Sequence, residues 1–254
     1  MKRKLNVSIF LVLAFLISTS VFAELTAEEI TRKAEDLMRG RSNTTTLTMT
    51  ITTPNWERTL TMESWEKGKD KSLVKITSPA KEAGTVSLKF ENNMWNYLPS
   101  VEKIIKIPPT MMMQSWMGSD FTNDDLVKES SIVDDYDPAL IGKETLEQGE
   151  VYLLELVPKP EAAVVWGRIV AYIRDGDYVP LKYEYYDEKG KLIRVMDLTE
   201  IKEMGGRTIP TVWTMVPKTK EGRKTVIILD RIEFNVPISE EIFSLSNLKR
   251  GIVP

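Results

Sequence analysis

Polar and hydrophobic residues alternate along most of the chain, which is the pattern of β-strands that bury one face. Threonine occupies the even positions from 46 to 52, whereas the odd positions hold Leu47, Met49 and Ile51. Leu60 and Met62 continue the pattern after a turn at 54–55. Further alternating or strand-like stretches cover 86–90, 94–98, 150–158, 165–174, 179–187, 191–202, 207–217 and 224–236. The turns between them are short, so neighbouring strands are predicted to be antiparallel, because a parallel crossover needs about a dozen residues.

One segment near the start has the period of a helix instead. Thr26 and Glu29 have the spacing of a capping box, and apolar residues recur on one helical face from Ile30 to Met38. Gly40 is a typical helix stop. The sequence therefore predicts a packing helix over 26–38.

Many of the predicted strands are apolar on one face only, as Leu181, Tyr183 and Tyr185 illustrate against Lys182 and Glu184. We therefore expect a mainly β (α+β) fold in which one curved antiparallel sheet forms an incomplete barrel, with the N-terminal helix and short lid helices on its concave side. A sandwich of two sheets produces similar alternation and is the alternative. Since no repeat or long linker interrupts the strands, residues 24–254 are predicted to form a single domain.

The first 23 residues have the three parts of a secretory signal. Lys2, Arg3 and Lys4 precede an apolar run over 9–17, and Val21-Phe22-Ala23 provides a small-x-small cleavage site. An uncleaved anchor is the alternative, but the run is short for a span of roughly 20 residues. We expect cleavage after Ala23 and export without a permanent membrane anchor.

Composition removes several classes of chemistry. The chain has no cysteine and no histidine, which excludes disulfides, thiol nucleophiles, a Ser-His-Asp triad and cysteine-based metal sites. The net charge of −3 becomes −6 once the three basic residues of the signal are removed, so nucleic acid is not an expected partner. We predict no cofactor, no metal and no catalytic residue. An exported hydrolase that uses Asp or Glu is the enzymatic alternative.

Residues 108–127 interrupt the strand pattern with a methionine-rich insert. Met113, Trp116 and Met117 have the i, i+3, i+4 spacing of a helical face, and Thr122 with Asp125 predicts the start of a second short helix. These side chains either plug one end of the barrel as ordinary core or form an adaptable lid over an apolar cavity, since methionine adapts to varied apolar partners.

Two pairs of neighbouring carboxylates also need an interpretation. Asp124-Asp125 falls at the predicted helix start, and Asp134-Asp135 precedes a turn-like sequence at 136–138. A calcium site is conceivable because oxygen ligands suffice for calcium. Capping and solvation explain both pairs without it, and we assign them a structural role.

The stretch from Met112 to Leu126 resembles the outer-membrane lipoprotein-sorting family, the LolA/LolB-like carriers, and specifically its branch of uncharacterised exported proteins. Residues 78–81 with Gly84-Thr85, residues 95–99 and Phe243-Ser244 support the resemblance. It implies an incomplete barrel that is lidded by helices around an apolar cavity. It also implies a periplasmic protein that carries the acyl chains of a lipoprotein or lipid toward the outer membrane.

The resemblance extends to the site and the partners. An inner-membrane transporter is the expected docking partner, and a lipoprotein sensor that acts through a membrane partner is the alternative. In the family's carrier an arginine just after the second strand latches the lid, but residues 65–69 contain none, so a generic lipid is an equally good ligand. The expected ligand-binding residues of cavity and lid are Leu47, Met49, Ile51, Leu60, Met62, Trp95, Met111, Met112, Met113, Trp116, Met117 and Phe121.

Overall fold

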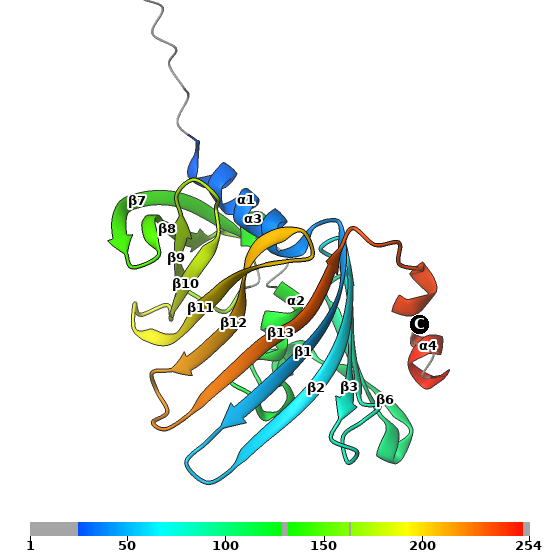
Figure 1. The fold of residues 1–254 in the computed structure, drawn as a ribbon. Helices are drawn as coiled ribbons and strands as arrows, with labels where there is room; N and C mark the ends of the chain where they lie inside the picture. The colour runs from blue at the N-terminus through cyan, green and yellow to red at the C-terminus, as the bar shows by residue number, and fades with distance from the viewer. Residues whose placement is uncertain (1–24, 129–131, 163, 251–254) are drawn as a thin grey trace, which may run out of the picture.

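The fold is one strongly curved antiparallel sheet (Figure 1), seen in a computed structural model that describes residues 25–128, 132–162 and 164–250. Its thirteen strands lie in the order β6-β5-β4-β3-β2-β1-β13-β12-β11-β10-β9-β8-β7. They are β1 (Ser42–Thr52), β2 (Glu57–Lys67), β3 (Lys71–Ser78), β4 (Val86–Phe90), β5 (Asn93–Leu98), β6 (Lys103–Ile107), β7 (Tyr136–Leu146), β8 (Gly149–Pro158), β9 (Arg168–Arg174), β10 (Pro180–Tyr186), β11 (Leu192–Met204), β12 (Arg207–Pro217) and β13 (Lys224–Phe234). Since β6 and β7 are the two edges of the sheet, the predicted incomplete barrel is confirmed. The predicted signal over 1–23 lies outside the described residues.

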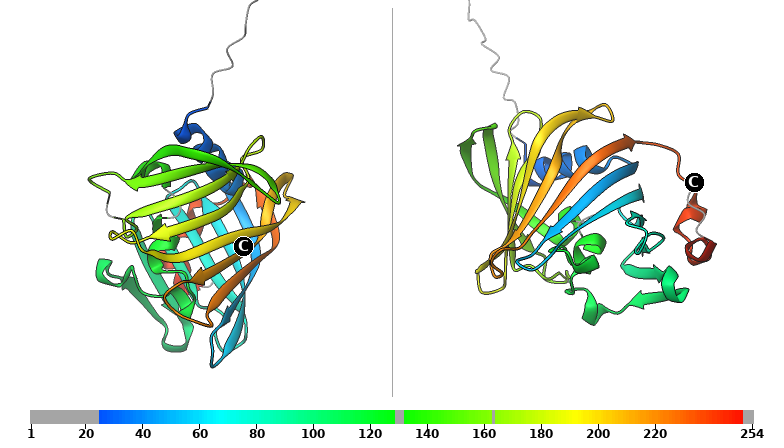
Figure 2. Two further views of the ribbon diagram at one scale, coloured as in Figure 1. Left: turned by 90° about the vertical axis from the view of Figure 1, so that its left-hand side faces the viewer. Right: turned by 60° about the horizontal axis from the view of Figure 1, so that its bottom comes forward.

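The N-terminal helix and two short helices lie on the concave side of the sheet, as predicted (Figure 2). The N-terminal helix α1 (Ala27–Arg39) begins with the expected capping box: Glu29 N donates to Thr26 Oγ1 at 3.2 Å, and Thr26 N donates to Glu29 Oε2 at 2.8 Å. Its Ile30 and Ala34 are buried in the main core. The short helix α2 (Asn123–Lys128) lies at the end of the methionine-rich insert, and the short helix α3 (Ile132–Asp135) follows the insert.

The strand alternation determines which side chains form the main core. Successive residues of a strand point to opposite faces, so the odd-numbered apolar residues of β1 lie together on the concave face. Met49 and Ile51 on β1 are fully buried there, as are Leu60 and Met62 on the paired strand β2. The threonines between them face the convex side, where Thr48 Oγ1 donates to Asp230 Oδ2 at 2.8 Å.

A second apolar cluster covers the convex face of β2 to β6. The C-terminal segment crosses this face as a 3₁₀ turn at Glu240–Phe243 and helix α4 (Leu245–Arg250), which lies outside the sheet in Figure 1. The buried members of this second cluster are Trp65, Leu73, Val86, Leu88, Ile238, Ile242, Phe243 and Leu248. Strand β4 is therefore buried on both faces, since four of its five residues are buried.

The same cluster corrects the placement of Trp95. That residue was expected on the concave face, but it pairs with Leu88 and packs in the convex cluster. Its neighbour Met94 takes the concave position instead and is 1% exposed. With apolar residues on both faces of β5, alternation alone does not distinguish the inner from the outer side.

Three strands were missed from the sequence, namely β3, β6 and β7. The turn predicted over 136–138 is wrong, because Tyr136 begins β7. Pro138 is tolerated there because β7 is an edge strand, where a missing N–H can face away from the ladder.

We expect the C-terminal segment to contribute directly to stability. Phe243 is 4% exposed within the convex cluster, so Phe243→Ala should lower the free energy of unfolding by about 3 kcal/mol through lost burial and a cavity. Leu245, which is 44% exposed in the same segment, is the control, and Leu245→Ala should cost less than about 0.5 kcal/mol. Urea denaturation of the two variants measures the difference; equal costs would show that the segment does not pack on the sheet.

Candidate functional site

The methionine-rich insert does not form the predicted first helix. Short 3₁₀ turns occupy Pro109–Met111 and Trp116–Gly118, and Met117 has a left-handed backbone with φ of 50°. Trp116 N donates to the carbonyl of Phe121 at 2.8 Å, which closes a compact loop between the two residues. The i, i+3, i+4 spacing was misleading because this loop satisfies its own backbone without a helix. As a result Trp116 is buried, whereas Met113 is 50% exposed.

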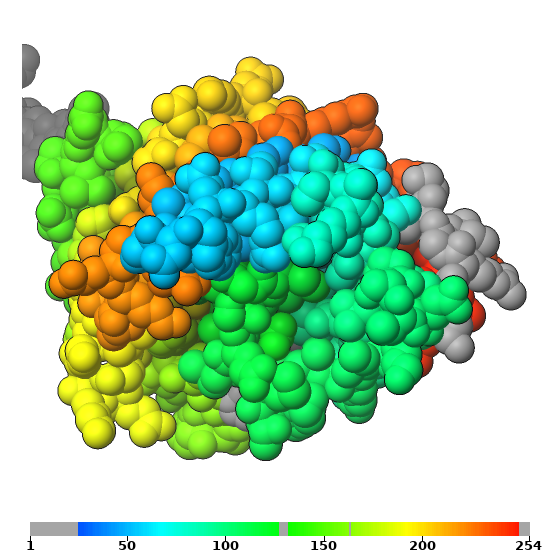
Figure 3. Space-filling model, turned by 90° about the horizontal axis from the view of Figure 1, so that it is seen from below, coloured from blue at the N-terminus to red at the C-terminus, as the bar shows by residue number. Residues whose placement is uncertain are grey.

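The insert closes one end of the curved sheet. Seen from below in Figure 3, the green residues of the insert fill the space between the blue strands β1 and β2 and the yellow strands on the opposite side. Trp116 and Phe121 belong to the main core, and Trp116 Nε1 donates to Ser87 Oγ on β4 at 3.0 Å. Trp116 and Phe121 are therefore core residues that close this end of the sheet, and the role of the insert as an adaptable lid stays a prediction.

Polar contacts anchor the insert to β2 and β13. Asp120 accepts a hydrogen bond from Arg223 Nε at 3.0 Å and another from Thr225 Oγ1 at 2.9 Å. From the other side, Arg58 on β2 donates to the backbone carbonyl of Met117 and pairs with Glu82 at 3.1 Å. Strands on both sides of the insert thus hold its loop.

The strongest anchor is an ion pair in the interior. Both carboxylate oxygens of Asp125 at the start of α2 accept hydrogen bonds from Arg194 on β11, whose Nη1 lies 2.7 Å from Asp125 Oδ2. The Arg194 guanidinium also lies 4.4 Å from the ring centroids of Trp166 and Tyr185. Asp125 additionally caps α2, because its Oδ2 accepts from Thr122 N at 2.6 Å. Thr122 Oγ1 in turn accepts from Asp125 N at 3.2 Å, so the helix start predicted at Thr122 is confirmed. The third residue of the helix, Asp125, thus also binds the sheet.

Two adjoining cavities lie between the insert, α1 and the sheet. The apolar cavity has a volume of about 140 Å³, and the charged cavity has a volume of about 190 Å³. Both are lined by Met38, Glu66, Val74, Leu126 and Trp213. The walls of the apolar cavity also include Leu47, Met62, Trp116, Phe121, Ile227, Leu229 and Ile232.

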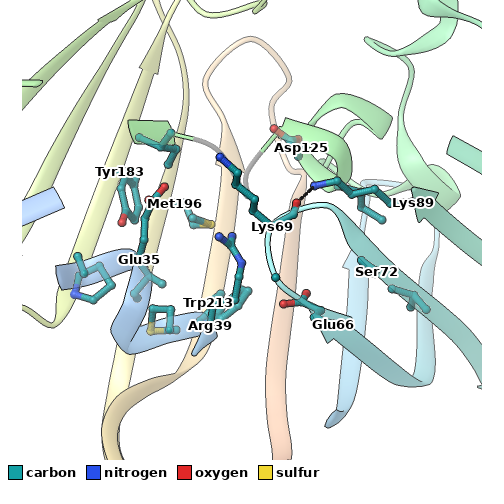
Figure 4. Close-up of a pocket in the computed structure, with 18 of the residues that line it drawn as sticks. Glu35, Arg39, Glu66, Lys69, Ser72, Lys89, Asp125, Tyr183, Met196 and Trp213 are labelled. Atoms are coloured by element: carbon teal, nitrogen blue, oxygen red, sulfur yellow. Dashed lines mark hydrogen bonds between the residues drawn. The ribbon is translucent and has the colours of Figure 1, made fainter. Parts of the chain in front are cut away.

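The charged cavity lies beside the C-terminal half of α1 and the β2–β3 turn (Figure 4). Its basic side chains are Arg39, Lys69, Lys71 and Lys89, and its carboxylates are Glu35, Glu66 and Asp125. Burial raises the pKa of Glu35, whereas Arg39 and backbone hydrogen bonds from Val133 and Ile132 act in the opposite direction. Glu35 Oε1 is buried without a hydrogen-bond partner. Burial therefore favours the neutral form of this carboxyl group more than water does.

The structure separates the twelve expected ligand-binding residues into five groups. Leu47, Met62, Trp116 and Phe121 line the apolar cavity. Met49, Ile51 and Leu60 are fully buried in the main core and line neither cavity. Met111, Met112 and Met117 pack partly buried against that core, and Met113 is exposed. Trp95 lies on the convex face.

Most of the cavity wall comes from residues that the sequence did not single out. Trp213 on β12, Val74 on β3 and Tyr183 on β10 belong to strands far apart in the chain, and they meet only because the sheet curves. Arg194 is 69 residues from Asp125, so no local pattern identifies their pairing. Its one visible signal is a charged residue at a position of β11 where the concave face is otherwise apolar, since Met196 and Leu198 follow it.

The described residues contain no group of three or more Asp or Glu side chains that could hold a metal ion. In the part of the chain that the structure describes, no helix is long and apolar enough to cross a membrane. The paired acids have other surroundings: Asp125 binds Arg194, and Asp134 at the end of α3 pairs with Lys69.

This architecture also occurs in proteins of known structure. A family model described as "Uncharacterized protein" matches residues 68–250. No curated protein matches the chain. Among solved structures, a DUF1329 family protein from Desulfovibrio piger is similar, with 25% identity and a TM-score of 0.81 over 87% of this chain and 97% of that one.

Two further solved structures share the fold. One is described as an outer membrane lipoprotein-sorting protein domain and comes from Vibrio parahaemolyticus, with 22% identity, a TM-score of 0.78 and coverage of 88% of this chain and 98% of that one. The other is a LolA superfamily protein from Nitrosomonas europaea, with 23% identity, a TM-score of 0.75 and coverage of 88% and 99%. At these identities the likeness concerns the fold.

The ion pair between Arg194 and Asp125 should be the costliest polar contact of the insert to break. Arg194→Met leaves a carboxylate buried without its partner, and the free energy of unfolding should fall by about 3–5 kcal/mol. Arg231→Met, which removes an exposed pair with Glu233, should cost less than about 0.5 kcal/mol. Guanidinium denaturation compares the two. Similar small costs for both variants would mean that the pair does not hold the insert.

Glu35 should make stability depend on pH. At low pH, where Glu35 is protonated in both the folded and the unfolded state, its burial does not destabilise the fold. As the pH rises through the raised pKa, the group has to ionise in its buried position, and the free energy of unfolding decreases. Glu35→Gln should therefore melt with the wild type near about pH 4 and above it near about pH 8. The exposed Glu203→Gln is the control and should show no such divergence. Parallel melting of wild type and Glu35→Gln across this range would contradict the assignment.

Proposed function

This chain belongs to the family of uncharacterised proteins whose model matches residues 68–250, and it has a LolA-like fold. From that premise we propose that the protein is a periplasmic carrier. Its cargo is the acyl chain of a lipoprotein or lipid, which it holds in the cavity for transfer toward the outer membrane. The predicted signal over 1–23 agrees with this location.

The observation that carries the proposal is the apolar cavity inside the curved sheet. Its wall combines Leu47 and Met62 from one half of the sheet with Ile227 and Leu229 from another strand, while Trp116 and Phe121 cover it from the insert. Although Asn43, Thr45, Ser64 and Glu66 also line the cavity, an acyl chain in this position would lie mainly against apolar side chains. Burial of this kind is worth about 0.8 kcal/mol for each CH₂ group that is removed from water. Sites for small molecules are typically concave and mostly apolar in this way.

The size of the cavities suggests how the cargo would enter. Together, the two cavities reach only the lower end of the range of about 300–1,000 Å³ that is usual for ligand sites. The closed form therefore suits a single chain, and a larger cargo would require the insert to move outward. The polar contacts of Asp120 and Asp125 to the sheet are the contacts that such a movement would break.

Binding accounts for the polar groups of the cavity better than hydrolysis does. Asp125 is held by Arg194, and Glu66 accepts a hydrogen bond from Asn43 Nδ2 at 2.9 Å. The third carboxylate, Glu35, faces the start of α3 with its pKa raised by burial. We assign these groups to holding the structure and regard a carboxylate hydrolase and a membrane-coupled sensor as the alternatives.

A carrier must receive and release its cargo, so we also propose transient docking to an inner-membrane transporter. The edge strand β7 and its neighbour β8 offer exposed apolar side chains for such a contact, among them Ile141 and Val157. Crosslinking in whole cells tests this part separately, because a carrier without a membrane partner would yield no crosslinked envelope protein.

The experiment that tests the carrier fills the cavities with a side chain of the protein. Val74 lines both cavities, and Val74→Trp should lower affinity for a fluorescent fatty acid at least tenfold by occupying the space of the chain. Fluorescence titration of the delipidated protein measures this affinity, and native mass spectrometry of protein purified without delipidation should detect bound lipid in the wild type and less in the variant.

A matched control is available on β8. Val157 is a valine on a strand, 44% exposed, so Val157→Trp adds the same volume without entering a cavity and should leave affinity within about twofold. Thermal melting of both variants separates lost binding from lost folding. Absence of any bound lipid together with no fatty-acid binding by the wild type would refute the carrier.

A further inference from the structure

The wall of the apolar cavity contains a buried hydroxyl group, that of Ser64 on β2, which is 6% exposed. Within the part of the chain that the structure describes, Ser64 Oγ makes no hydrogen bond. The other three buried serines of this part all donate to acceptors of the protein, at 2.6–2.8 Å; they are Ser42, Ser87 and Ser119. A buried donor without an acceptor costs free energy, and a ligand that brings an acceptor to Ser64 removes this cost.

The register of the sheet directs Ser64 toward the interior. Side chains alternate along a strand, and Met62 and Glu66, two residues to either side, both line the apolar cavity. The next residue, Trp65, packs in the convex cluster instead. Ser64 also pairs with Thr45 on β1, which lines the same cavity. The hydroxyl group of Ser64 therefore faces the space in which the cargo is proposed to lie.

Polarity changes in steps along β1 and β2 on this face. Three successive cross-strand pairs line the apolar cavity, namely Leu47–Met62, Thr45–Ser64 and Asn43–Glu66. The first pair is apolar, the second carries two hydroxyl groups, and the third carries an amide and a carboxylate. An acyl chain that lies along Leu47 and Met62 with its head toward Glu66 would bring the polar group at its end beside Ser64.

The middle pair has the chemistry to bind a neutral acceptor. Thr45 Oγ1 donates its proton to Asn43 Oδ1 at 3.2 Å, whereas the Ser64 hydroxyl is available as a donor. The carboxylate of Glu66, one pair further along, would repel an ionised carboxylate placed beside Ser64. The carbonyl group of an ester or an amide carries no charge and accepts a hydrogen bond from a hydroxyl.

We infer that Ser64 determines specificity for an acyl chain in a neutral linkage, because its Oγ donates a hydrogen bond to the carbonyl oxygen of the ester or amide at the head of the chain. This inference rests on the proposed carrier function and specifies the class of its cargo. The hydrogen bond also sets how far the chain enters the cavity, since the wall beyond Ser64 is apolar at Met62 and Leu47.

The test uses three neutral probes of equal length that differ around the carbonyl group. Methyl dodecanoate contains an ester, N-methyldodecanamide contains an amide, and dodecyl methyl ether lacks the carbonyl oxygen. Each probe is titrated against delipidated protein by displacement of a fluorescent fatty acid. The effect of a substitution is compared between probes, because this cycle removes the differences in hydrophobicity among the probes themselves.

Ser64→Ala should weaken the binding of the ester, the amide or both by about three- to tenfold, the size of one neutral hydrogen bond, and leave the ether within about twofold. The melting temperature should not fall, because alanine removes a hydroxyl group that has no partner among the described residues. A clear fall would assign the hydroxyl group to folding and refute the inference.

Ser72→Ala is the matched control. Ser72 on β3 pairs with Glu66 and lines the charged cavity (Figure 4), but it does not line the apolar cavity. Its substitution should therefore leave the affinities of all three probes within about twofold. A loss of carbonyl binding in Ser72→Ala that Ser64→Ala does not show would contradict the assignment to Ser64.

The outcomes separate this inference from the function on which it rests. A loss with the ester alone or the amide alone supports the inference and identifies the linkage that the site prefers. If Ser64→Ala leaves all three affinities unchanged, or weakens the ether as much as the carbonyl probes, the inference is refuted and the carrier stands. The same holds if the fatty acid binds and no neutral probe displaces it. If the fatty acid itself does not bind, the carrier fails.

Discussion

The insert stays over the cavities because one guanidinium group, that of Arg194, holds Asp125 inside the protein. The pair connects β11 to the first turn of α2, and both of its members are almost completely removed from water. Two charges in such a place are tolerated only where geometry and additional contacts are good. Here the carboxylate also caps α2, and the guanidinium lies against the rings of Trp166 and Tyr185. The position of α2, and with it the roof of the cavities, depends on this arrangement.

This arrangement also explains how the insert is held without an arginine just after the second strand. Residues 65–69 contain none, yet the insert is held by arginines from β2, from β11 and from the turn before β13. The same task of fixing a loop over an apolar space is therefore performed by side chains from other parts of the sheet. What matters for holding the insert is where the folded sheet places an arginine side chain, and not where that arginine lies in the sequence.

The elements with strong local signals were predictable from the sequence. The capping box at Thr26 and Glu29, the alternation of β1 and the helix start at Thr122 each involve residues within a few positions of one another, and all three are present. Prediction failed where a local spacing rule conflicted with the tertiary structure. Met113, Trp116 and Met117 have helical spacing but lie in a loop that closes on itself.

The site was harder to predict than the fold. Its wall is assembled from strands that are neighbours only in the sheet, so Trp213, Val74 and Tyr183 have no shared sequence signal. Trp95 was misplaced because the C-terminal segment covers the convex side and makes β5 apolar on both faces. A covering segment that arrives more than a hundred residues later cannot be recognised from the strand itself.

The open seam between β6 and β7 has a mechanical consequence. In a closed barrel the ladder of hydrogen bonds fixes the circumference, so the interior can widen only if backbone bonds break. In this sheet, among the described residues, the two edge strands are not joined, and a change in curvature needs only small adjustments of twist spread over many strands. The width of the interior can therefore adjust elastically: the sheet can open to accommodate a thicker ligand and close again around a thinner one.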